Sequence, residues 1–360
     1  LIESEMYGKA PAPPKEGISA VLVETGEGAG GGWIREQWDI RLTGTPSGPT
    51  VHVLIARPKN IQKDTLLPAF LGLNFQGNHT IHSDPEIRIP TALTYRNAAP
   101  SATPRGDKSN RWPIQQITEA GFALVTAYCG DIDPDTKSDA NGLQSAFYQS
   151  GQTQPAPDEW GTIAAWTWGL SRILDMLCHH PHIDGENRVA VIGHSRLGKT
   201  ALWTAASDPR FAMAISNNSG CGGAALSKRA QGETVARINQ SFPHWFCRNF
   251  RKYGNNEKAL PFDQHQLIAL IAPRPVYVAS ASKDLWADPE GEYLALRGAE
   301  PIYALYADPG LPESRFPQPN IPLHGVRLAY HLREGKHDIT PWDWTHYIEF
   351  AGLHLTPESP

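Results

Sequence analysis

The sequence has few charged residues, and its positive and negative charges nearly balance. Lys, Arg, Asp and Glu make up 19% of the 360 residues, and the formal net charge at pH 7 is -5. The chain therefore lacks the basic field that attracts nucleic acid, and it lacks a polybasic segment that would hold it at a membrane surface. We expect no nucleic acid and no membrane among its partners, and a neutral or weakly charged molecule as its substrate.

Long apolar runs are also absent. No stretch approaches the roughly 20 apolar residues of a membrane-spanning helix. The chain starts at Leu1, without a methionine or a charged leader that runs into an apolar segment. We therefore expect a secreted or periplasmic protein whose signal peptide has been removed, or a start that has been trimmed in another way.

Motifs for metal ions are weak or missing. Residues 131–135 imitate the start of a calcium loop, but Thr136 stands where that loop needs glycine and Gly142 where it needs glutamate. The histidines at 179, 180 and 182 are more typical of a solvated turn than of a metal site. We expect no metal and no cofactor. The chain has four cysteines without a C-x-x-C pair, which leaves their disulfide state open: Cys129, Cys178, Cys221 and Cys247.

The order of apolar runs predicts alternating strands and helices, and no internal repeat divides the chain. We expect one domain over residues 1–360, with an extended surface arm over residues 1–18. Strands are predicted at 36–42, 51–56, 68–73, 122–127, 189–192, 211–216, 275–280 and 326–332, the first two at the sheet edge. Helices are predicted at 112–120, 158–177 (with Asp158 as N-cap), 197–207, 290–306 and 342–355. Long loops at 75–111 and 129–157 are places where binding residues commonly collect.

The octapeptide at residues 193–200, Gly-His-Ser-Arg-Leu-Gly-Lys-Thr, carries the strongest chemical signal. It fits the phosphate-binding G-x-x-x-x-G-K-[ST] loop, and it also fits the serine turn of an α/β-hydrolase. Both readings need a buried strand, a tight turn and a helix. The segment alone therefore does not decide between a nucleotide-binding protein and a hydrolase.

The rest of the chain favours the hydrolase. Asp284 follows a predicted strand by several residues, and His337 lies in a Gly-Lys-His-Asp loop after the next strand. The order Ser195, Asp284, His337 is the order of nucleophile, acid and base in α/β-hydrolases. Asp288 competes with Asp284 for the role of the acid because both lie in one loop. A phosphate loop usually follows the first strand of its domain, whereas several strand-like runs precede this turn.

Two cationic residues, Arg196 and Lys199, follow Ser195 closely in the sequence. The backbone N–H of Arg196 is expected to point into the oxyanion hole, and its guanidinium could add a charged donor. Lys199 lies one helical turn after Ser195, on the same face, and could reach a bound substrate. A cation at a helix start is disfavoured by the helix dipole, so two of them suggest a use.

The turn closely resembles the G-[CH]-S-R-x-G-K segment of the glucuronoyl esterases, carbohydrate esterase family fifteen. Residues 232–239, 242–246, 284–289 and 335–338 look like the bacterial branch of that family, and the resemblance covers roughly residues 120–350. It implies an α/β-hydrolase fold: a three-layer α/β sandwich with a central, mostly parallel sheet and long loop insertions. It also implies an enzyme that cleaves esters between (4-O-methyl)glucuronic acid on xylan and lignin alcohols. Apart from the resemblance, we expect a monomer, although the sequence itself does not state the oligomeric state.

The same resemblance assigns roles to individual residues. It implies Ser195 as nucleophile, His337 as base and Arg196 as oxyanion stabiliser, and it implies sugar contacts by Lys199, Trp286 and Glu233. Many members carry a glutamate in an E-S-G-x-G-G segment, whereas residues 218–223 begin here with Asn218 and offer no carboxylate. The acid is then expected to be Asp284. His194 replaces the cysteine of fungal members, so their disulfide is not expected.

Two other activities remain possible from the sequence. A carbohydrate acetyl esterase could use the same triad, and a phosphate-loop nucleotide binder is the more remote alternative. A sugar-binding relative without turnover would need an incomplete triad.

Overall fold

The computed structural model describes residues 1–44, 48–62, 65–90, 102–137 and 142–356. The chain divides into two compact units. One unit consists of Leu1–Lys9, Ala156–Ala164 and Ala190–Pro360, and the other of Ala10–Pro155 and Ala165–Val189. The expected single domain over the whole chain stays a prediction.

The unit that contains the C-terminus holds five strands in the order β6-β7-β8-β10-β9. Strands β6, β7, β8 and β10 pair in parallel in this order, and β9 pairs with β10 in the antiparallel direction. Every residue of β6, β7, β8 and β10 is buried, which explains why these strands read as continuous apolar runs in the sequence. The strands are β6 Val189–His194, β7 Met213–Asn217, β8 Val276–Ala281, β9 Leu323–His324 and β10 Leu328–Arg333.

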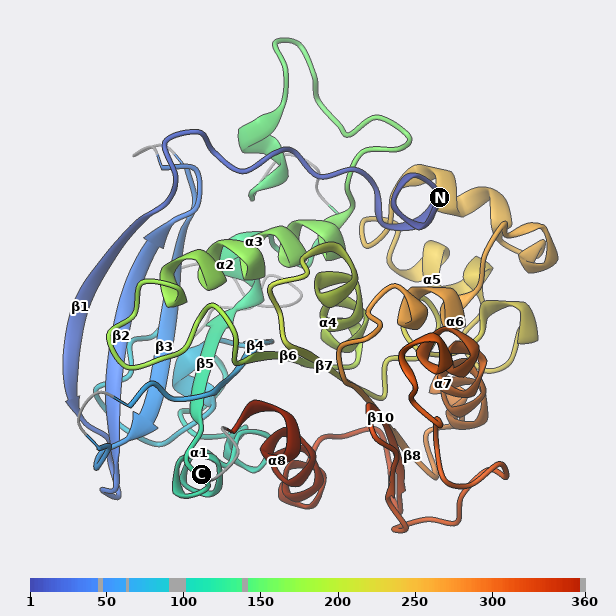
Figure 1. Ribbon diagram of the computed structural model, residues 1–360. Helices are drawn as coiled ribbons and strands as arrows, with labels where there is room; N and C mark the ends of the chain where they lie inside the picture. Colours follow the sequence, from blue (N-terminus) through green and yellow to red (C-terminus); the bar gives the residue numbers. More distant parts are fainter. Residues whose placement is uncertain (45–47, 63–64, 91–101, 138–141, 357–360) are drawn as a thin grey trace. The chain divides into compact units, whose positions relative to one another are not determined.

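Longer and shorter helices and several short turns connect these strands. Helices α6 and α7 run side by side after the central loops, drawn in orange (Figure 1). The helices are α4 Arg196–Ser207, α5 Val235–Ser241, α6 Gln264–Ala269, α7 Pro289–Tyr303 and α8 Pro341–Leu355. The short turns are η1 Glu3–Tyr7, η7 Ser227–Arg229, η8 Arg248–Tyr253, η9 Glu257–Ala259, η10 Leu285–Ala287 and η11 Ala304–Tyr306.

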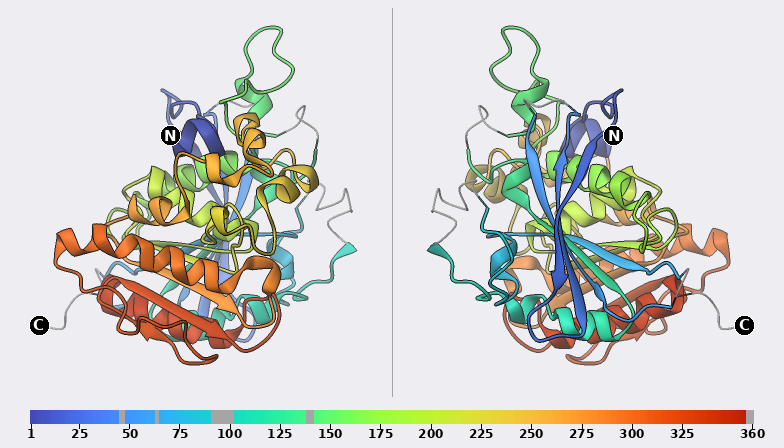
Figure 2. Two further views of the ribbon diagram at one scale, coloured as in Figure 1. Left: turned by 90° about the vertical axis from the view of Figure 1, so that its right-hand side faces the viewer. Right: turned by 90° about the vertical axis from the view of Figure 1, so that its left-hand side faces the viewer.

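The other unit holds the strands β1-β2-β3-β5-β4. Strands β5 and β4 are parallel, and the pairs β1–β2, β2–β3 and β3–β5 are antiparallel. The long N-terminal strands, drawn in blue, are strongly twisted (Figure 2). The strands are β1 Ser19–Glu27, β2 Trp33–Arg41, β3 Thr50–Pro58, β4 Ala69–Asn74 and β5 Ala123–Tyr128. The helices are η2 Asn78–Thr80, η5 Ser109–Arg111, α1 Ile114–Glu119, α2 Cys129–Ile132, η6 Gln144–Phe147 and α3 Thr162–Leu177, whose first turn belongs to the C-terminal unit.

The N-terminal segment differs from the expected arm. Residues 3–7 form the turn η1, and Met6 and Tyr7 are fully buried. The Tyr7 hydroxyl donates to the carbonyl of Gly222 at 2.8 Å, and its ring stacks on Trp203 with centroids 4.6 Å apart. Burial of two large apolar side chains stabilises this segment by a few kcal/mol, roughly 1.5–3 per side chain, which an extended surface arm would forgo.

Three further expectations are wrong. Strands β2 and β3 are not edge strands, because the unpredicted β1 pairs with β2 along its length. Asp158 does not cap α3, which begins at Thr162, and it pairs instead with Lys9 at 2.8 Å. His180 does not lie in a solvated turn, because its ring is buried and Nε2 lies 2.8 Å from the Glu36 carboxylate. A buried carboxylate needs such a hydrogen-bond partner to offset its lost hydration.

Candidate active site

The serine turn joins β6 to α4. Ser195 has φ 58° and ψ -129°, a strained conformation that residues with a side chain seldom adopt. Its N–H donates to the carbonyl of Asn217 at 2.8 Å. Gly193 is required two residues earlier, because a Cβ there would lie 1.9 Å from the carbonyl oxygen of Leu197. The hydrogen bond to Asn217 and the close approach at Gly193 therefore maintain the strained backbone of Ser195. This is the sharp strand-to-helix turn of a nucleophile elbow.

The structure joins His337 to Asp284. Atom Nδ1 of His337 lies 2.6 Å from Oδ2 of Asp284. Asp284 follows β8 and His337 follows β10, and these two strands are parallel neighbours, so their carboxyl ends meet at one edge of the sheet. The His337 ring also packs on His194, the residue before Ser195, with centroids 4.6 Å apart. The predicted base and acid are thus brought together beside the serine turn.

The Asp284 carboxylate is held in its ionised form. Burial, the largest influence, raises its pKa, but hydrogen bonds from His337 and Asn218 outweigh burial and leave the pKa below its usual value. The side-chain amide of Asn218 donates to the same oxygen, Oδ2, at 2.9 Å. Because an ionised carboxylate only accepts, His337 must carry a proton on Nδ1, which leaves Nε2 as the basic nitrogen.

Asp288, the competing acid, has a different environment. Its Oδ1 accepts from the N–H of Gly291 at 3.1 Å and caps α7, and its Oδ2 lies 3.0 Å from the guanidinium of Arg229. Asp284 and Asp288 are almost equally buried, at 6% and 7% exposed. The difference between them therefore lies in their partners and not in their access to water.

Lys199 is buried, at 4% exposed. Its ammonium donates to the carbonyls of Ser219 and Cys221 and lies 3.8 Å from the Glu233 carboxylate. A buried ammonium needs such partners to offset lost hydration. Burial raises the pKa of Glu233, and the charge of Lys199 opposes that rise.

Glu233 and Trp286 lie on two segments that touch through their backbones. The N–H of Glu233 donates to the carbonyl of Trp286 at 2.9 Å. Gly232 has φ 61°, and a Cβ there would lie 2.3 Å from the same carbonyl oxygen, so only glycine permits this approach. Trp286 is 52% exposed. The three predicted sugar contacts are thus linked, with the acid buried beside the ammonium and the indole open to solvent.

Arg196 is the first residue of α4, where the backbone N–H groups have no carbonyl partner within the helix. Its guanidinium carbon lies 5.8 Å from the ring centroid of Trp245, and the Lys199 ammonium lies 6.0 Å from the same centroid. At these distances an aromatic face attracts a cation. Trp245 therefore orients both cations of the turn, a role that the sequence did not indicate.

Glu292 is a second residue that sequence reasoning missed. This fully buried side chain of α7 accepts from the N–H of Gly220 at 2.9 Å and from the hydroxyls of Ser219 and Ser280 at 3.1 and 2.6 Å. Burial raises its pKa to about 7. Glu292 thereby fixes the loop that follows Asn218. Its burial could have been predicted from the helical spacing, since Glu292 shares one face of α7 with Ala295, Leu296 and Ala299, all of them buried.

The remaining features of the described residues concern membrane spans, metal ligands and cysteines. Within the described ranges no helix is both long and apolar enough to cross a membrane, and no three His, Cys, Asp or Glu side chains gather as a metal site would require. All four cysteines carry free thiols.

Comparisons with known proteins point in one direction. A family model described as "Glucuronyl esterase, fungi" matches residues 75–307, more than half of the chain. The chain is 47% identical to Carbohydrate esterase MZ0003 of an unknown prokaryotic organism, over 99% of this chain and 83% of that protein.

Two further relatives differ in how much of each chain is matched. The structure of the glucuronoyl esterase from Solibacter usitatus superimposes with a TM-score of 0.91 at 39% identity, covering 99% of this chain and 90% of that one. The chain is 35% identical to 4-O-methyl-glucuronoyl methylesterase 1 of Phanerochaete chrysosporium, over 57% of this chain and 45% of that protein. The match thus spans less than half of that fungal relative.

Proposed function

The chain belongs to the glucuronoyl esterase family, and from this membership we propose that it is a serine esterase that cleaves esters of glucuronic acid. The observation that carries the mechanism is the 2.6 Å contact between His337 and Asp284 beside the turn of Ser195. The name of the fungal relative supports (4-O-methyl)glucuronoyl esters as the substrate. The sequence resemblance supports xylan as the carrier of these groups and lignin alcohols as their ester partners.

The chemistry follows from the order of these groups. Nε2 of His337 takes the hydroxyl proton of Ser195 as the oxygen attacks the ester carbonyl, and the imidazolium then protonates the leaving alcohol. Asp284 stabilises that imidazolium without accepting its proton. Water, activated by the same histidine, attacks the acyl-enzyme and releases glucuronate and free Ser195.

The developing oxyanion is stabilised at the start of α4. The backbone N–H of Arg196 lies at the positive end of the helix, and the Arg196 guanidinium supplies a second, charged donor. Such donors act on the transition state more than on the substrate, so they raise kcat.

The linked group of Lys199, Glu233 and Trp286 is suited to a sugar acid. The indole offers an apolar face to the ring, and the polar pair offers a donor and an acceptor to its hydroxyls. Because Lys199 already donates to two carbonyls, we assign it chiefly to holding the 219–221 loop and Glu233 in place.

The nucleotide-binding alternative is set aside, because the family match includes the residues that suggested a phosphate loop. The acetyl esterase alternative uses the same triad and is separated by experiment. A secreted or periplasmic location is part of the proposal, in keeping with a polymeric plant substrate.

The test is hydrolysis of benzyl glucuronate and of acetylated xylose by the wild-type protein and by Ser195→Ala. We expect turnover of the glucuronate ester, with a loss of roughly 10⁴-fold in the variant, as is typical when a triad member is removed. Turnover of acetylated xylose alone would instead establish the acetyl esterase. Turnover of neither ester would overturn the proposal.

A further inference from the structure

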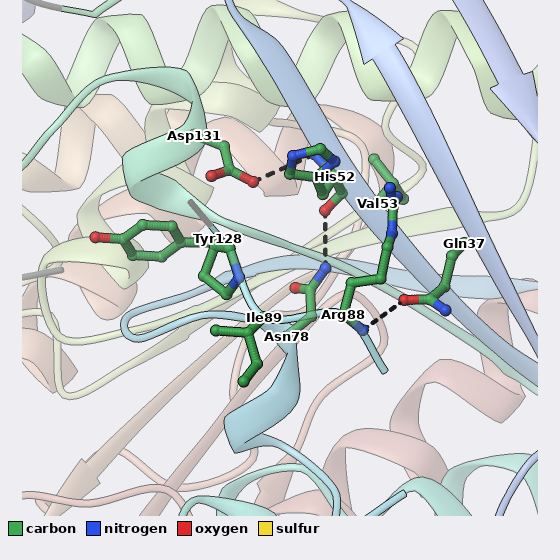
Figure 3. Close-up of a pocket in the computed structure, with 9 residues that line it drawn as sticks. Gln37, His52, Val53, Asn78, Arg88, Ile89, Tyr128 and Asp131 are labelled. Atoms are coloured by element: carbon green, nitrogen blue, oxygen red, sulfur yellow. Dashed lines mark hydrogen bonds between the residues drawn. The ribbon is translucent and has the colours of Figure 1, made fainter. Parts of the chain in front are cut away.

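A second pocket lies in the unit that contains β1 to β5, and no role in ester hydrolysis uses it. It has a volume of about 150 Å³ and is formed by β2, β3, the end of β5, the start of α2 and the loop after η2 (Figure 3). A cavity of about this size is large enough to hold a six-membered ring, since one engineered in another protein binds benzene. The polar residues that line it are Gln37, His52, Asn78, Arg88, Tyr128 and Asp131.

The pocket is built by a continuous set of hydrogen bonds. The N–H of His52 donates to Oδ2 of Asp131 at 3.2 Å, and its carbonyl accepts from the amide of Asn78 at 2.8 Å. On the other strand, the side-chain oxygen of Gln37 accepts from the N–H of Arg88 at 2.8 Å. These bonds, dashed in Figure 3, fix the lining in place, so the pocket exists before any ligand arrives.

Two polar atoms of this lining lack partners within the described residues. The Asp131 side chain is 8% exposed, and the N–H of His52 provides the only hydrogen bond that it accepts there, on Oδ2. The Nε–H of Arg88 is buried and donates to no acceptor in the same part of the chain. A buried N–H without an acceptor calls for an explanation, and a ligand hydroxyl can accept from the Nε–H of Arg88. The same hydroxyl can donate to Oδ1 of Asp131, which accepts from no described residue.

The charges around the pocket favour a neutral ligand. The guanidinium of Arg88 lies 2.6 Å from the Asp39 carboxylate, and Nδ1 of His52 lies 2.7 Å from the same group. The positive charge that could attract an anion is therefore already paired. A divalent cation would need several oxygen ligands, and the pocket offers one carboxylate outside these ion pairs, Asp131.

The rest of the lining is apolar. Val53 and Pro90 contribute to the wall, and Ile89, which is 45% exposed, lies at the opposite end of the view from Asp131 and His52 (Figure 3). A ligand that fits must carry hydroxyls on one side and C–H groups on the other. A pyranose ring has this distribution.

We propose that this pocket binds a single neutral pyranose, with a ring hydroxyl donating to Asp131 and ring C–H groups packed on Ile89 and Val53. The inference goes beyond ester hydrolysis and stands or falls separately from it, because the ligand carries no ester and no carboxylate.

Saturation-transfer NMR of methyl β-xyloside and of xylotriose with the full protein tests the proposal. We expect binding of both sugars, and at least about tenfold weaker binding by Asp131→Leu, since a hydrogen bond to a charged group is lost. Ile89→Lys provides a second variant at a position that is 45% exposed. It replaces the apolar side chain on which the ring C–H groups pack by a charged one, and a weakening of sugar binding is again expected.

The control variant is Glu233→Gln, which alters the other unit. Sugar binding that persists in Glu233→Gln and weakens in both pocket variants supports the proposal. Binding that is lost in Glu233→Gln but kept in the pocket variants would place the sugar at the candidate active site and overturn it. Absence of binding to the wild-type protein, or binding of inorganic phosphate in place of the sugars, would overturn it as well.

Discussion

Two buried aspartates, one in each unit, follow the carboxyl end of a parallel strand and have opposite fates. Asp284 accepts from His337 and Asn218, and these bonds lower its pKa despite burial. Asp131 accepts one backbone N–H, and burial raises its pKa to about 6. Position in the fold is therefore not enough to make a catalytic acid, because the partners decide the direction in which the pKa of the carboxylate shifts.

The largest expected effect comes from breaking the first of these arrangements. Asp284→Asn should lower kcat on benzyl glucuronate by roughly 10⁴-fold, because an amide favours the wrong tautomer of the histidine. Steady-state kinetics measure this effect. Asp288→Asn is the matched control: it is buried to the same degree in the same loop and should keep kcat within about threefold. The asparagine oxygen still caps α7, so only the ion pair with Arg229 is lost.

A smaller effect should follow from removing the second partner of Asp284. Asn218 has φ 48°, a left-handed conformation that glycine tolerates. Asn218→Gly therefore removes one hydrogen bond to the carboxylate without backbone strain, which corresponds to about tenfold in kcat/KM. The loss should appear in kcat, with KM unchanged, because the bond positions the acid and does not touch substrate. A kcat equal to that of the wild type would show that His337 alone positions Asp284.

The pH dependence of stability should distinguish carboxyl groups with a raised pKa, Glu292 and Asp131, from Asp284, whose pKa is lowered. Burial raises the pKa of Glu292 from its usual 4.5 to about 7 in the folded protein, so the folded state keeps this proton to a higher pH than the unfolded state does. This contribution to stability is present in full below about pH 4.5 and is lost as pH rises to about 7. Glu292→Gln should therefore show a smaller fall in Tm between pH 5 and pH 8 than the wild type, measured by calorimetry.

Asp131 should behave in the same direction over a narrower range. Its pKa rises from 3.8 to about 6, so its contribution falls as pH increases between these values. Asp131→Asn should reduce the fall in Tm between pH 4 and pH 6. The contribution of Asp284 has the opposite sign, because its lowered pKa favours the folded state above the unfolded value and is lost as pH falls. Equal pH profiles for Asp131→Asn and the wild type would refute the assigned environment.

The positions of the triad residues could be predicted from the sequence, whereas the contacts that hold them in place could not. The positions of Ser195, Asp284 and His337 follow from sequence order, because consecutive parallel strands bring their carboxyl ends to one edge. The confirmed α/β-hydrolase fold rests on the same apolar runs, together with the structural match. The assigned roles of these residues stay predictions until activity is measured.

What the sequence did not indicate depends on distant pairings. The bond from Asn218 to Asp284 spans 66 residues and that from Glu292 to Gly220 spans 72. The second pocket needs the antiparallel pairing of β3 with β5, whose register no local pattern states. The strand β1 was missed because its half-exposed residues do not alternate cleanly between apolar and polar.

The most direct test of the central claim is the rate at which a fluorophosphonate labels the wild-type protein, Asp284→Asn and Asp288→Asn, followed by intact mass and peptide mapping. We expect one label on Ser195, a labelling rate in Asp288→Asn close to the wild-type rate, and a labelling rate in Asp284→Asn lower by a factor of at least about 100. A label on another residue, or equal rates in the two variants, would contradict a triad of Ser195, His337 and Asp284.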